Sequence, residues 1–186
     1  GSEGEHAAPM VGEPVSPLAL RPEYEGNPLP GFIPGIDYLA SHYRQLRRVR
    51  GDGNCFYRAF LYSYLETLRR LKDTEKSKKE RARFLALLEG SKAQLEANGY
   101  PEFTFEDFLS ELQELVDSLY TLDEAGLLAL FQADGKADCY TWFMRLLTAL
   151  SLRQDAETYT PFIFESGCYD MNTFCRNEVE PMGKEC

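Results

Sequence analysis

The chain has 186 residues, of which 44% are hydrophobic and 13% aromatic, enough to build the core of one folded domain but hardly of two. Its formal net charge of −10 argues against a nucleic-acid partner, because phosphate binding needs clustered cations. No apolar run approaches the roughly 20 residues that cross a membrane, so a membrane protein is not expected.

Residues 1–35 differ in composition from the rest of the chain. They hold most of the ten prolines, together with glycine, glutamate and serine, and this mixture predicts a flexible, proline-rich N-terminal tail. The folded domain is then expected to occupy residues 36–186. A first helix is predicted from Ile36 to Arg48, followed by a turn over residues 50–54.

The turn Asp52-Gly53-Asn54 delivers Cys55 to the start of a long amphipathic helix. Apolar side chains recur behind the cysteine at helical spacing, at Phe56, Phe60, Tyr64, Leu68 and Leu71. A thiol in this position faces unpaired backbone N–H groups and the positive end of the helix dipole, and both favour the thiolate. The Asp-Gly and Gly-Asn steps also allow unusual backbone angles, so that several N–H groups can converge on one point, as in an oxyanion hole.

Cys55 is therefore a candidate nucleophile. The basic residues that precede it also favour a thiolate: Arg44, Arg47, Arg48 and Arg50. Free cysteine is nevertheless among the residue types most often buried, so a buried structural thiol is an equal alternative on these residues alone.

Helical signals continue downstream of this helix. The charge-rich stretch 74–88 predicts an exposed helix, and Ser91 is expected to cap a short helix that Gly99 closes. Capping-box patterns that begin at Thr104 and Thr121 precede two further apolar-periodic runs.

The last third of the chain predicts two more helices and little strand. One helix is expected over residues 136–153, and Asp170 is expected to cap a last helix that Pro181 stops. Only short segments such as residues 159–164 have the pattern of a strand. The chain is therefore predicted to be a series of helices in which a sheet is missing.

The five cysteines include no CxxC pair, which argues against a disulfide framework and against a zinc site. Cys168 and Cys175 have no histidine nearby and are predicted to be core thiols rather than metal ligands. Reduced thiols fit a cytoplasmic protein, with the nucleus as a further compartment.

Residues 52–59, Asp-Gly-Asn-Cys-Phe-Tyr-Arg-Ala, resemble the nucleophile motif of the ovarian-tumour (OTU) family of deubiquitinating cysteine proteases, and specifically its otubain subfamily. Three later stretches resemble otubain sequence in the same order: residues 103–108, residues 145–148, and residues 174–182. The resemblance covers roughly residues 36–186.

The resemblance implies an α+β, OTU-type cysteine protease fold, of which this chain covers mainly the helical N-terminal part, with the sheet largely in a missing C-terminal part. It implies that Cys55 attacks isopeptide bonds of ubiquitin conjugates and that the backbone at Asp52, Gly53 and Asn54 forms the oxyanion loop. No metal or organic cofactor is implied. The implied partners are ubiquitin and polyubiquitin chains, linked through lysine forty-eight of ubiquitin, and also ubiquitin-conjugating enzymes.

A thiol protease also needs a general base, which is normally a histidine. The chain has two histidines: His6 falls in the predicted tail, and His42 is expected to be an ordinary residue of the first helix. In otubain-like proteins the catalytic histidine follows several strands near the C-terminus. We therefore expect an incomplete catalytic domain whose general-base histidine is not in this chain, so that the fragment alone is weak or inactive.

Two alternatives remain at this stage. In the first, the chain is a non-catalytic binding module for ubiquitin or a ubiquitin-conjugating enzyme, which its acidic charge and the missing histidine support. In the second, it is a plain helical interaction domain whose motif similarity is accidental.

Overall fold

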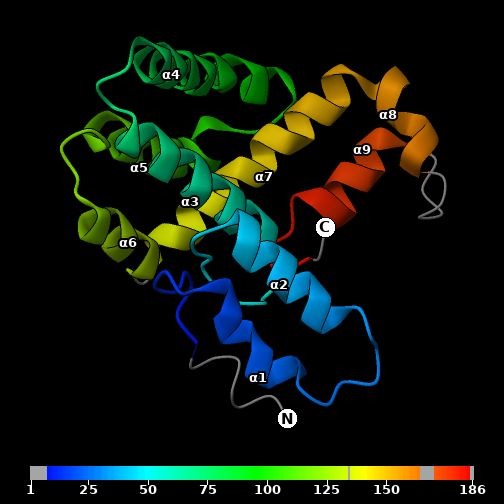
Figure 1. Ribbon diagram of the computed structural model, residues 1–186. Helices are drawn as coiled ribbons and strands as arrows, with labels where there is room; N and C mark the ends of the chain where they lie inside the picture. The colour runs from blue at the N-terminus through cyan, green and yellow to red at the C-terminus, as the bar shows by residue number, and fades with distance from the viewer. Residues whose placement is uncertain (1–7, 134, 164–169, 185–186) are drawn as a thin grey trace. The chain divides into compact units, whose positions relative to one another are not determined.

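The structure of the chain is a computed structural model that describes residues 8–133, 135–163 and 170–184 (Figure 1). The chain divides into two compact units, residues 1–50 and residues 51–186. Helices dominate the described residues, which contain no β-strand and only two isolated antiparallel bridges. The predicted series of helices is therefore confirmed for this part of the chain. None of the described helices is long and apolar enough to cross a membrane.

The first unit combines short helical segments with two extended ones. The helical segments are the 3₁₀ turn η1 (Pro17–Leu20), α1 (Arg21–Tyr24) and α2 (Phe32–His42). The extended segments meet at two bridges, Val11 with Val49 and Val15 with Leu46.

This arrangement corrects the prediction of a flexible tail over residues 1–35, because residues 8–35 carry helices and bridges. The prolines do not prevent helix formation, since Pro17 and Pro22 fall in the first turn of their helices, where the backbone N–H would have no acceptor. The division between the two compact units accordingly falls after Arg50 in the sequence, and not at the predicted boundary between residues 35 and 36.

The first long helix also differs from its prediction. It begins at Phe32 rather than Ile36 and ends at His42 rather than Arg48. Residues after His42 are extended because their backbone pairs with residues 11–15 through the two bridges. The apolar pattern of this stretch fits a helix, but its backbone pairs with residues 11–15, which lie far back in the chain, and is therefore extended.

The second unit is a helical bundle around α7 (Lys136–Gln154), which Figure 1 shows crossing the middle of this unit. The elements that surround it are α3 (Cys55–Arg70), α4 (Glu75–Ala97), the 3₁₀ turn η2 (Glu102–Thr104), α5 (Glu106–Ser118), α6 (Glu124–Gln132), α8 (Ala156–Ile163), α9 (Met171–Phe174) and the π-helical turn η4 (Cys175–Val179). α7 contacts α3, α4, α5, α6, α8, α9 and η4. It can do so because it buries side chains on several sides, among them Ala137, Tyr140, Phe143, Leu146, Ala149 and Leu150.

Three predicted helix starts are confirmed. α3 begins at Cys55, α7 begins at Lys136, and Asp170 caps α9 by accepting a hydrogen bond from the Thr173 N–H at 2.8 Å. The helical turn that follows α9 ends at Val179, two residues before the proline that was expected to stop it.

The two helices predicted over residues 74–88 and 91–99 form one continuous helix, α4. Ser91 is buried inside this helix and does not cap one, because its hydroxyl donates to the Leu88 carbonyl at 2.6 Å and is thereby satisfied within the preceding turn. The residue that caps α4 is Thr74, whose Oγ1 accepts a hydrogen bond from the Ser77 N–H at 3.2 Å.

Three other predictions of secondary structure are wrong. Thr104 lies in η2 and Thr121 lies in a turn, so neither caps a helix. α6 is capped by Asp123, which accepts a hydrogen bond from the Gly126 N–H at 2.7 Å. The strand candidate 159–164 is helical within α8 as far as Ile163, and its last residue lies outside the described residues.

Candidate active site

Cys55 is the first residue of the 16-residue helix α3, and its side chain is exposed. The first N–H groups of an α-helix have no acceptor within the helix, and they carry its positive end. Asn54 occupies the N-cap position but makes no capping hydrogen bond with its side chain. The structure thus places the predicted nucleophile at an uncapped helix start, with its thiol open to solvent.

The turn before Cys55 is closed by the side chain of Asp52. Its Oδ1 accepts a hydrogen bond from the Asn54 N–H at 3.0 Å. The guanidinium of Arg58 binds both carboxylate oxygens, with N–O distances of 3.0 and 2.8 Å. Arg58 lies one turn into α3 and is fully buried, so this bidentate pair ties the turn to the helix that it precedes.

Two opposing effects set the charge of Asp52. Burial by itself would raise the pKa of its carboxyl group, but the hydrogen bonds from Arg58 and from the Asn54 N–H, together with the Arg58 charge, lower the pKa below its ordinary value. Asp52 is therefore a carboxylate at neutral pH, and it shapes the turn rather than donating a proton.

A second arginine, Arg145 of α7, holds the same turn from the other side. Its side chain is fully buried. It donates to the Gly53 carbonyl at 2.6 Å, and to Oδ1 of Asn54 from Nε at 3.2 Å and from a terminal nitrogen at 3.0 Å. Two further hydrogen bonds reach the carbonyls of Val179 at 2.9 Å and Lys184 at 2.7 Å. One guanidinium therefore joins α7, the turn and the C-terminal segment 179–184.

The C-terminal segment also contacts the turn directly. The Gly183 N–H donates to Oδ1 of Asn54 at 3.0 Å. Gly53 has a φ of +77°, and a Cβ placed on it would lie 2.1 Å from the Gly183 carbonyl oxygen. Only glycine fits at position 53, because a side chain would be strained in this conformation and would collide with the segment.

A polar network fastens the C-terminal segment to α7. Arg153 donates to Oε1 of Glu180 at 2.5 Å and to the Tyr100 hydroxyl at 2.7 Å, and Tyr100 donates to the same Glu180 oxygen at 2.5 Å. Burial, and then the hydrogen bond to Glu180, raise the pKa of Tyr100 to about 12. The C-terminal segment, which contacts the turn of residues 52–54, is thus held by two arginines of one helix. We call residues 52–54 the nucleophile turn, after the prediction made for Cys55.

Cys175, which was predicted to be a core thiol, is buried. It packs with Ala149, Ile163, Met171 and Val179, and its thiol lies 3.7 Å from the Ala149 carbonyl oxygen. Its predicted companion at position 168 lies outside the described residues.

The predicted basic cluster is engaged within the first unit. Arg48 forms an ion pair with Glu23, Arg47 donates to the Gly12 carbonyl at 3.1 Å, and Arg50 donates to the Ala8 carbonyl at 2.7 Å. The effect of these cations on the Cys55 thiol stays a prediction.

His42 is likewise occupied within the first unit. Its Nδ1 lies 2.8 Å from the Tyr38 carbonyl oxygen and 2.8 Å from the Ser41 hydroxyl, and its ring centroid is 4.0 Å from that of Tyr38. His6 lies outside the described residues.

An apolar strip runs along the outer face of α3, beginning at the residue after Cys55. Phe56 and Phe60 are 60% and 53% exposed. Their ring centroids are 6.4 Å apart, and the Phe60 ring stacks on Tyr64 at 6.2 Å. We call these three residues the α3 strip.

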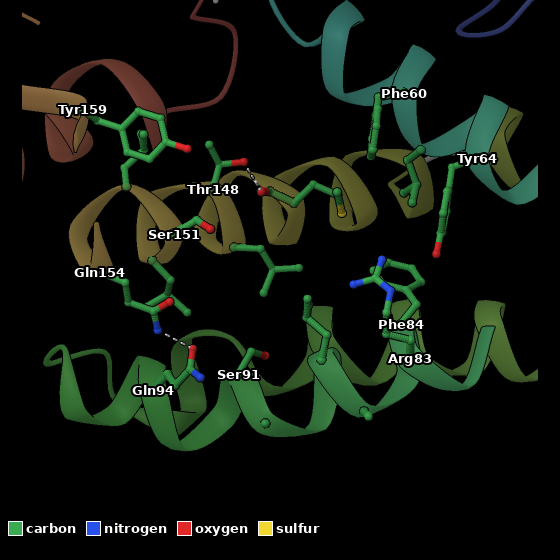
Figure 2. Close-up of a pocket in the computed structure, with 18 residues that line it drawn as sticks. Phe60, Tyr64, Arg83, Phe84, Ser91, Gln94, Thr148, Ser151, Gln154 and Tyr159 are labelled. Carbon is green, nitrogen blue, oxygen red and sulfur yellow. Dashed lines mark hydrogen bonds between the residues drawn. The ribbon is translucent and has the colours of Figure 1, made fainter. Parts of the chain in front are cut away.

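Beside the α3 strip lies an open groove of about 610 Å³ between α3, α4, α7 and α8. Figure 2 shows Phe60 and Tyr64 on one side of it, Phe84 and Gln94 of α4 below, and Tyr159 at the far end. The walls are mainly apolar. The described residues around this groove and elsewhere contain no group of three or more His, Cys, Asp or Glu side chains that could hold a metal ion.

Arg58 and Arg145 were not predicted as site residues. A signal was present, because each is a lone cation within an apolar stretch of a helix, Arg58 after a tyrosine and Arg145 between a methionine and a leucine. Charged residues are rarely fully buried without a partner, so such a cation marks a polar contact inside the fold.

Comparison with known proteins places this geometry in context. The family described as peptidase C65, otubain, matches residues 3–186. The OVARIAN TUMOR DOMAIN-containing deubiquitinating enzyme 1 of Arabidopsis thaliana is 37% identical over 185 residues, which are 95% of this chain and 58% of that protein. The human ubiquitin thioesterase OTUB1 is 37% identical over 179 residues, which are 95% of this chain and 62% of that protein. The chain therefore spans about three fifths of the length of these relatives.

Solved structures agree with the sequence comparison. A ceOTUB1 ubiquitin aldehyde UBC13~Ub complex contains a chain of similar fold, with a TM-score of 0.86 and 30% identity, over 98% of this chain and 71% of that one. A complex of h/ceOTUB1, ubiquitin aldehyde and UBCH5B~Ub matches with a TM-score of 0.84 and 30% identity, over 96% of this chain and 68% of that one.

Proposed function

Because the chain belongs to the otubain family of peptidases, we propose that it carries the nucleophile of a thiol-dependent deubiquitinase. The Cys55 thiolate attacks the carbonyl carbon of the isopeptide bond between the ubiquitin C-terminus and a lysine. The tetrahedral intermediate collapses to a thioester, releasing the lysine amine, and water then hydrolyses the thioester. The observation that carries this proposal is the exposed thiol at the uncapped start of α3, behind a turn that two buried arginines hold.

The backbone at Asp52, Gly53 and Asn54 is the proposed oxyanion loop. The two polar side chains of this loop are engaged, Asp52 with Arg58 and Asn54 with Arg145. The Asn54 N–H is engaged as well, since it donates to Asp52. The N–H groups at the start of α3, beginning with that of Cys55, are therefore the donors that we assign to the oxyanion.

The general base is proposed to be a histidine that is not in this chain. His42 uses its ring within α2, and both histidines of the chain precede residue 51, so the second unit has none. We place the base, and the sheet of the α+β OTU-type fold, in sequence that the longer relatives have in addition. The residues from 36 onward remain our proposal for the part of the catalytic domain present here.

The proposed substrates are ubiquitin conjugates and polyubiquitin, in particular chains linked through lysine forty-eight of ubiquitin. Support comes from the relatives named ubiquitin thioesterases and from the similar chains solved with ubiquitin aldehyde. The linkage is proposed from the family resemblance alone. The chemistry needs no metal or organic cofactor, and the free thiols at Cys55 and Cys139 suit the cytoplasm or the nucleus.

A second candidate function is non-catalytic binding of ubiquitin-conjugating enzymes. The similar ceOTUB1 chain was solved in a complex with UBC13~Ub, and the h/ceOTUB1 chain in a complex with UBCH5B~Ub. In this second proposal, the chain binds a ubiquitin-charged conjugating enzyme without turnover.

A ubiquitin probe with a C-terminal electrophile separates these functions. We expect it to label the chain at Cys55 and Cys55→Ala to abolish the labelling, whereas Cys139→Ala, which removes a half-buried thiol, leaves it unchanged. His42→Ala should alter the rate by less than about threefold, because a residue outside the chemistry contributes little to transition-state free energy. Reversible binding without labelling would favour the binding module, and labelling of another cysteine would refute the assignment of Cys55.

A further inference from the structure

Arg145 differs from the other buried arginine of the site in its partners. Arg58 is neutralised by the Asp52 carboxylate at 2.8 Å. Among the described residues, Arg145 forms no ion pair, and its hydrogen-bond acceptors are three main-chain carbonyls and one side-chain amide oxygen. Burying a cation is costly unless its donors are satisfied. Packing alone therefore does not account for a fully buried arginine in the middle of α7.

The acceptors fall into two groups that lie far apart in the sequence. Gly53 and Asn54 immediately precede the nucleophile, whereas Val179 and Lys184 belong to the C-terminal segment. A guanidinium is planar and rigid, so its hydrogen bonds fix both groups in one geometry. The guanidinium carbon also lies 4.7 Å from the ring centroid of Tyr57, in the first turn of α3, which restrains it from a third direction.

We propose that Arg145 is a positioning residue: its guanidinium couples the nucleophile turn to the C-terminal segment 179–184, and this direct coupling holds Cys55 in its reactive orientation. The consequence for isopeptide hydrolysis rests on the proposed function. The consequence for the orientation and reactivity of the thiol does not.

Arg153 provides a matched control on the same helix. It holds the same C-terminal segment through Glu180, and it also binds Tyr100 and Oδ1 of Asn172. These three partners lie outside the nucleophile turn. If segment docking and general stability were all that mattered, removing either arginine would have the same effect on Cys55.

The test compares the full chain with Arg145→Met, Arg145→Lys and Arg153→Met, at a temperature where circular dichroism shows every variant folded. Two rates are measured: alkylation of Cys55 by iodoacetamide, with Cys139 as the internal reference, and labelling by the electrophilic ubiquitin probe over a range of probe concentrations. The concentration series separates the maximal labelling rate from the apparent binding constant.

We expect both Arg145 variants to lower the maximal labelling rate ~10-fold or more, since small misplacements of a reacting group can cost up to ~100-fold. The apparent binding constant should change less than ~3-fold, because the probe's own contacts are untouched. Iodoacetamide alkylation of Cys55 relative to Cys139 should change in the same variants. Arg153→Met should lower thermal stability and leave both Cys55 rates within ~3-fold of wild type.

Two results would overturn the proposal. One is an unchanged Cys55 rate in both assays for folded Arg145→Met. The other is full rescue by Arg145→Lys, which would show that charge alone matters, because an ammonium cannot span the same acceptors. A third result separates the two proposals. If the variants change Cys55 alkylation as expected but the ubiquitin probe never labels the wild-type chain, the proposed function fails and the positioning role stands.

Asn54→Ala keeps the proposal testable if Arg145→Met does not fold. This change removes the turn's side-chain acceptor while leaving Arg145 in place. It should slow Cys55 labelling, and an unchanged rate would refute the coupling. Where both single variants fold, the double variant should be no slower than the slower single one, since contacts that act as a unit are not additive. Fully additive losses would contradict a shared contact.

Discussion

At the scale of single residues, the nucleophile turn depends on a close approach between backbones. Gly53 lies against Gly183, which has a φ of +76°, and the Asn54 side chain accepts from the N–H of that second glycine. Neither contact involves a large side chain, so ordinary hydrophobic burial does not explain them. They explain why the turn tolerates no Cβ at position 53 and why its geometry depends on the C-terminal segment.

Gly53→Ala is predicted to destabilise the chain and to slow labelling of Cys55. Left-handed backbone costs a non-glycine residue roughly 1–2 kcal/mol, and the clash with Gly183 adds to this cost. Chemical denaturation measures the loss, and the electrophilic ubiquitin probe measures the rate. Gly51→Ala is the control, since a Cβ there meets nothing within 4 Å. Equal behaviour of the two variants would refute the steric argument.

At the scale of elements, α7 binds the C-terminal segment along its length. Arg145 and Arg153 lie about two turns apart on this helix and bind the segment at different points. Between them, Cys175 and Val179 pack on Ala149. Polar contacts at the two ends and an apolar contact in the middle together fix the register of the segment along the helix.

The network at Tyr100 predicts a loss of stability at alkaline pH. The pKa of Tyr100 is raised from 10.0 to about 12 in the folded chain, so the folded state holds the phenol proton more tightly than the unfolded state. This contribution is complete below about pH 10 and is lost as the pH rises through about 12. Tyr100→Phe should be less stable at pH 8 but should lose less stability between about pH 10 and about pH 12. Urea denaturation at each pH tests this, and an unchanged alkaline slope would contradict it.

The α3 strip predicts that the isolated chain binds an apolar dye. The structure buries much of α7 but leaves Phe56 and Phe60 of α3 exposed. Replacing both by serine should reduce dye fluorescence and change the free energy of unfolding by less than ~0.5 kcal/mol, as is usual for exposed positions. Leu65→Ser, a fully buried position of the same helix, should unfold the chain and raise dye binding. Unaltered fluorescence in the double variant would place the dye elsewhere.

At the scale of the whole molecule, the chain presents the exposed thiol of Cys55 at a helix start, and the same compact unit contains no histidine. It spans 58% and 62% of two otubain relatives. A thiol held at a helix start can react with a strong electrophile by itself, whereas hydrolysis of an unactivated isopeptide also needs proton transfer to the leaving amine.

We therefore predict that the 186-residue chain reacts with the electrophilic probe but hydrolyses diubiquitin slowly. A version extended by the C-terminal sequence of its relatives should be faster by ~10²–10⁴-fold, the usual contribution of general acid–base catalysis. Gel-based cleavage of diubiquitin, with Cys55→Ala as the blank, measures the difference. Full activity of the 186-residue chain would show that it contains its own base.

What could be predicted from the sequence was determined locally. The helix starts at Cys55 and Lys136, and the cap at Asp170, follow from residues within about one helical turn of each other, and the nucleophile motif is itself contiguous. The same local rules failed at Ser91, which was predicted to cap a helix but donates to the Leu88 carbonyl inside one. They also failed at Pro17, which falls in the predicted flexible tail but lies in the first turn of a helix, where proline is tolerated.

The rest of the candidate site was decided by tertiary structure. Arg145 reaches Asn54 across 91 residues, and Gly183 reaches it across 129. Helical periodicity and capping patterns relate residues a few positions apart and do not reach across such separations. The energetic role of a buried cation depends instead on which carbonyl groups the packing of distant segments brings to it. The sequence by itself therefore determined which residue carries the thiol and that a helix starts there. Only the packing of α7 and the C-terminal segment against the turn decided how that thiol is held.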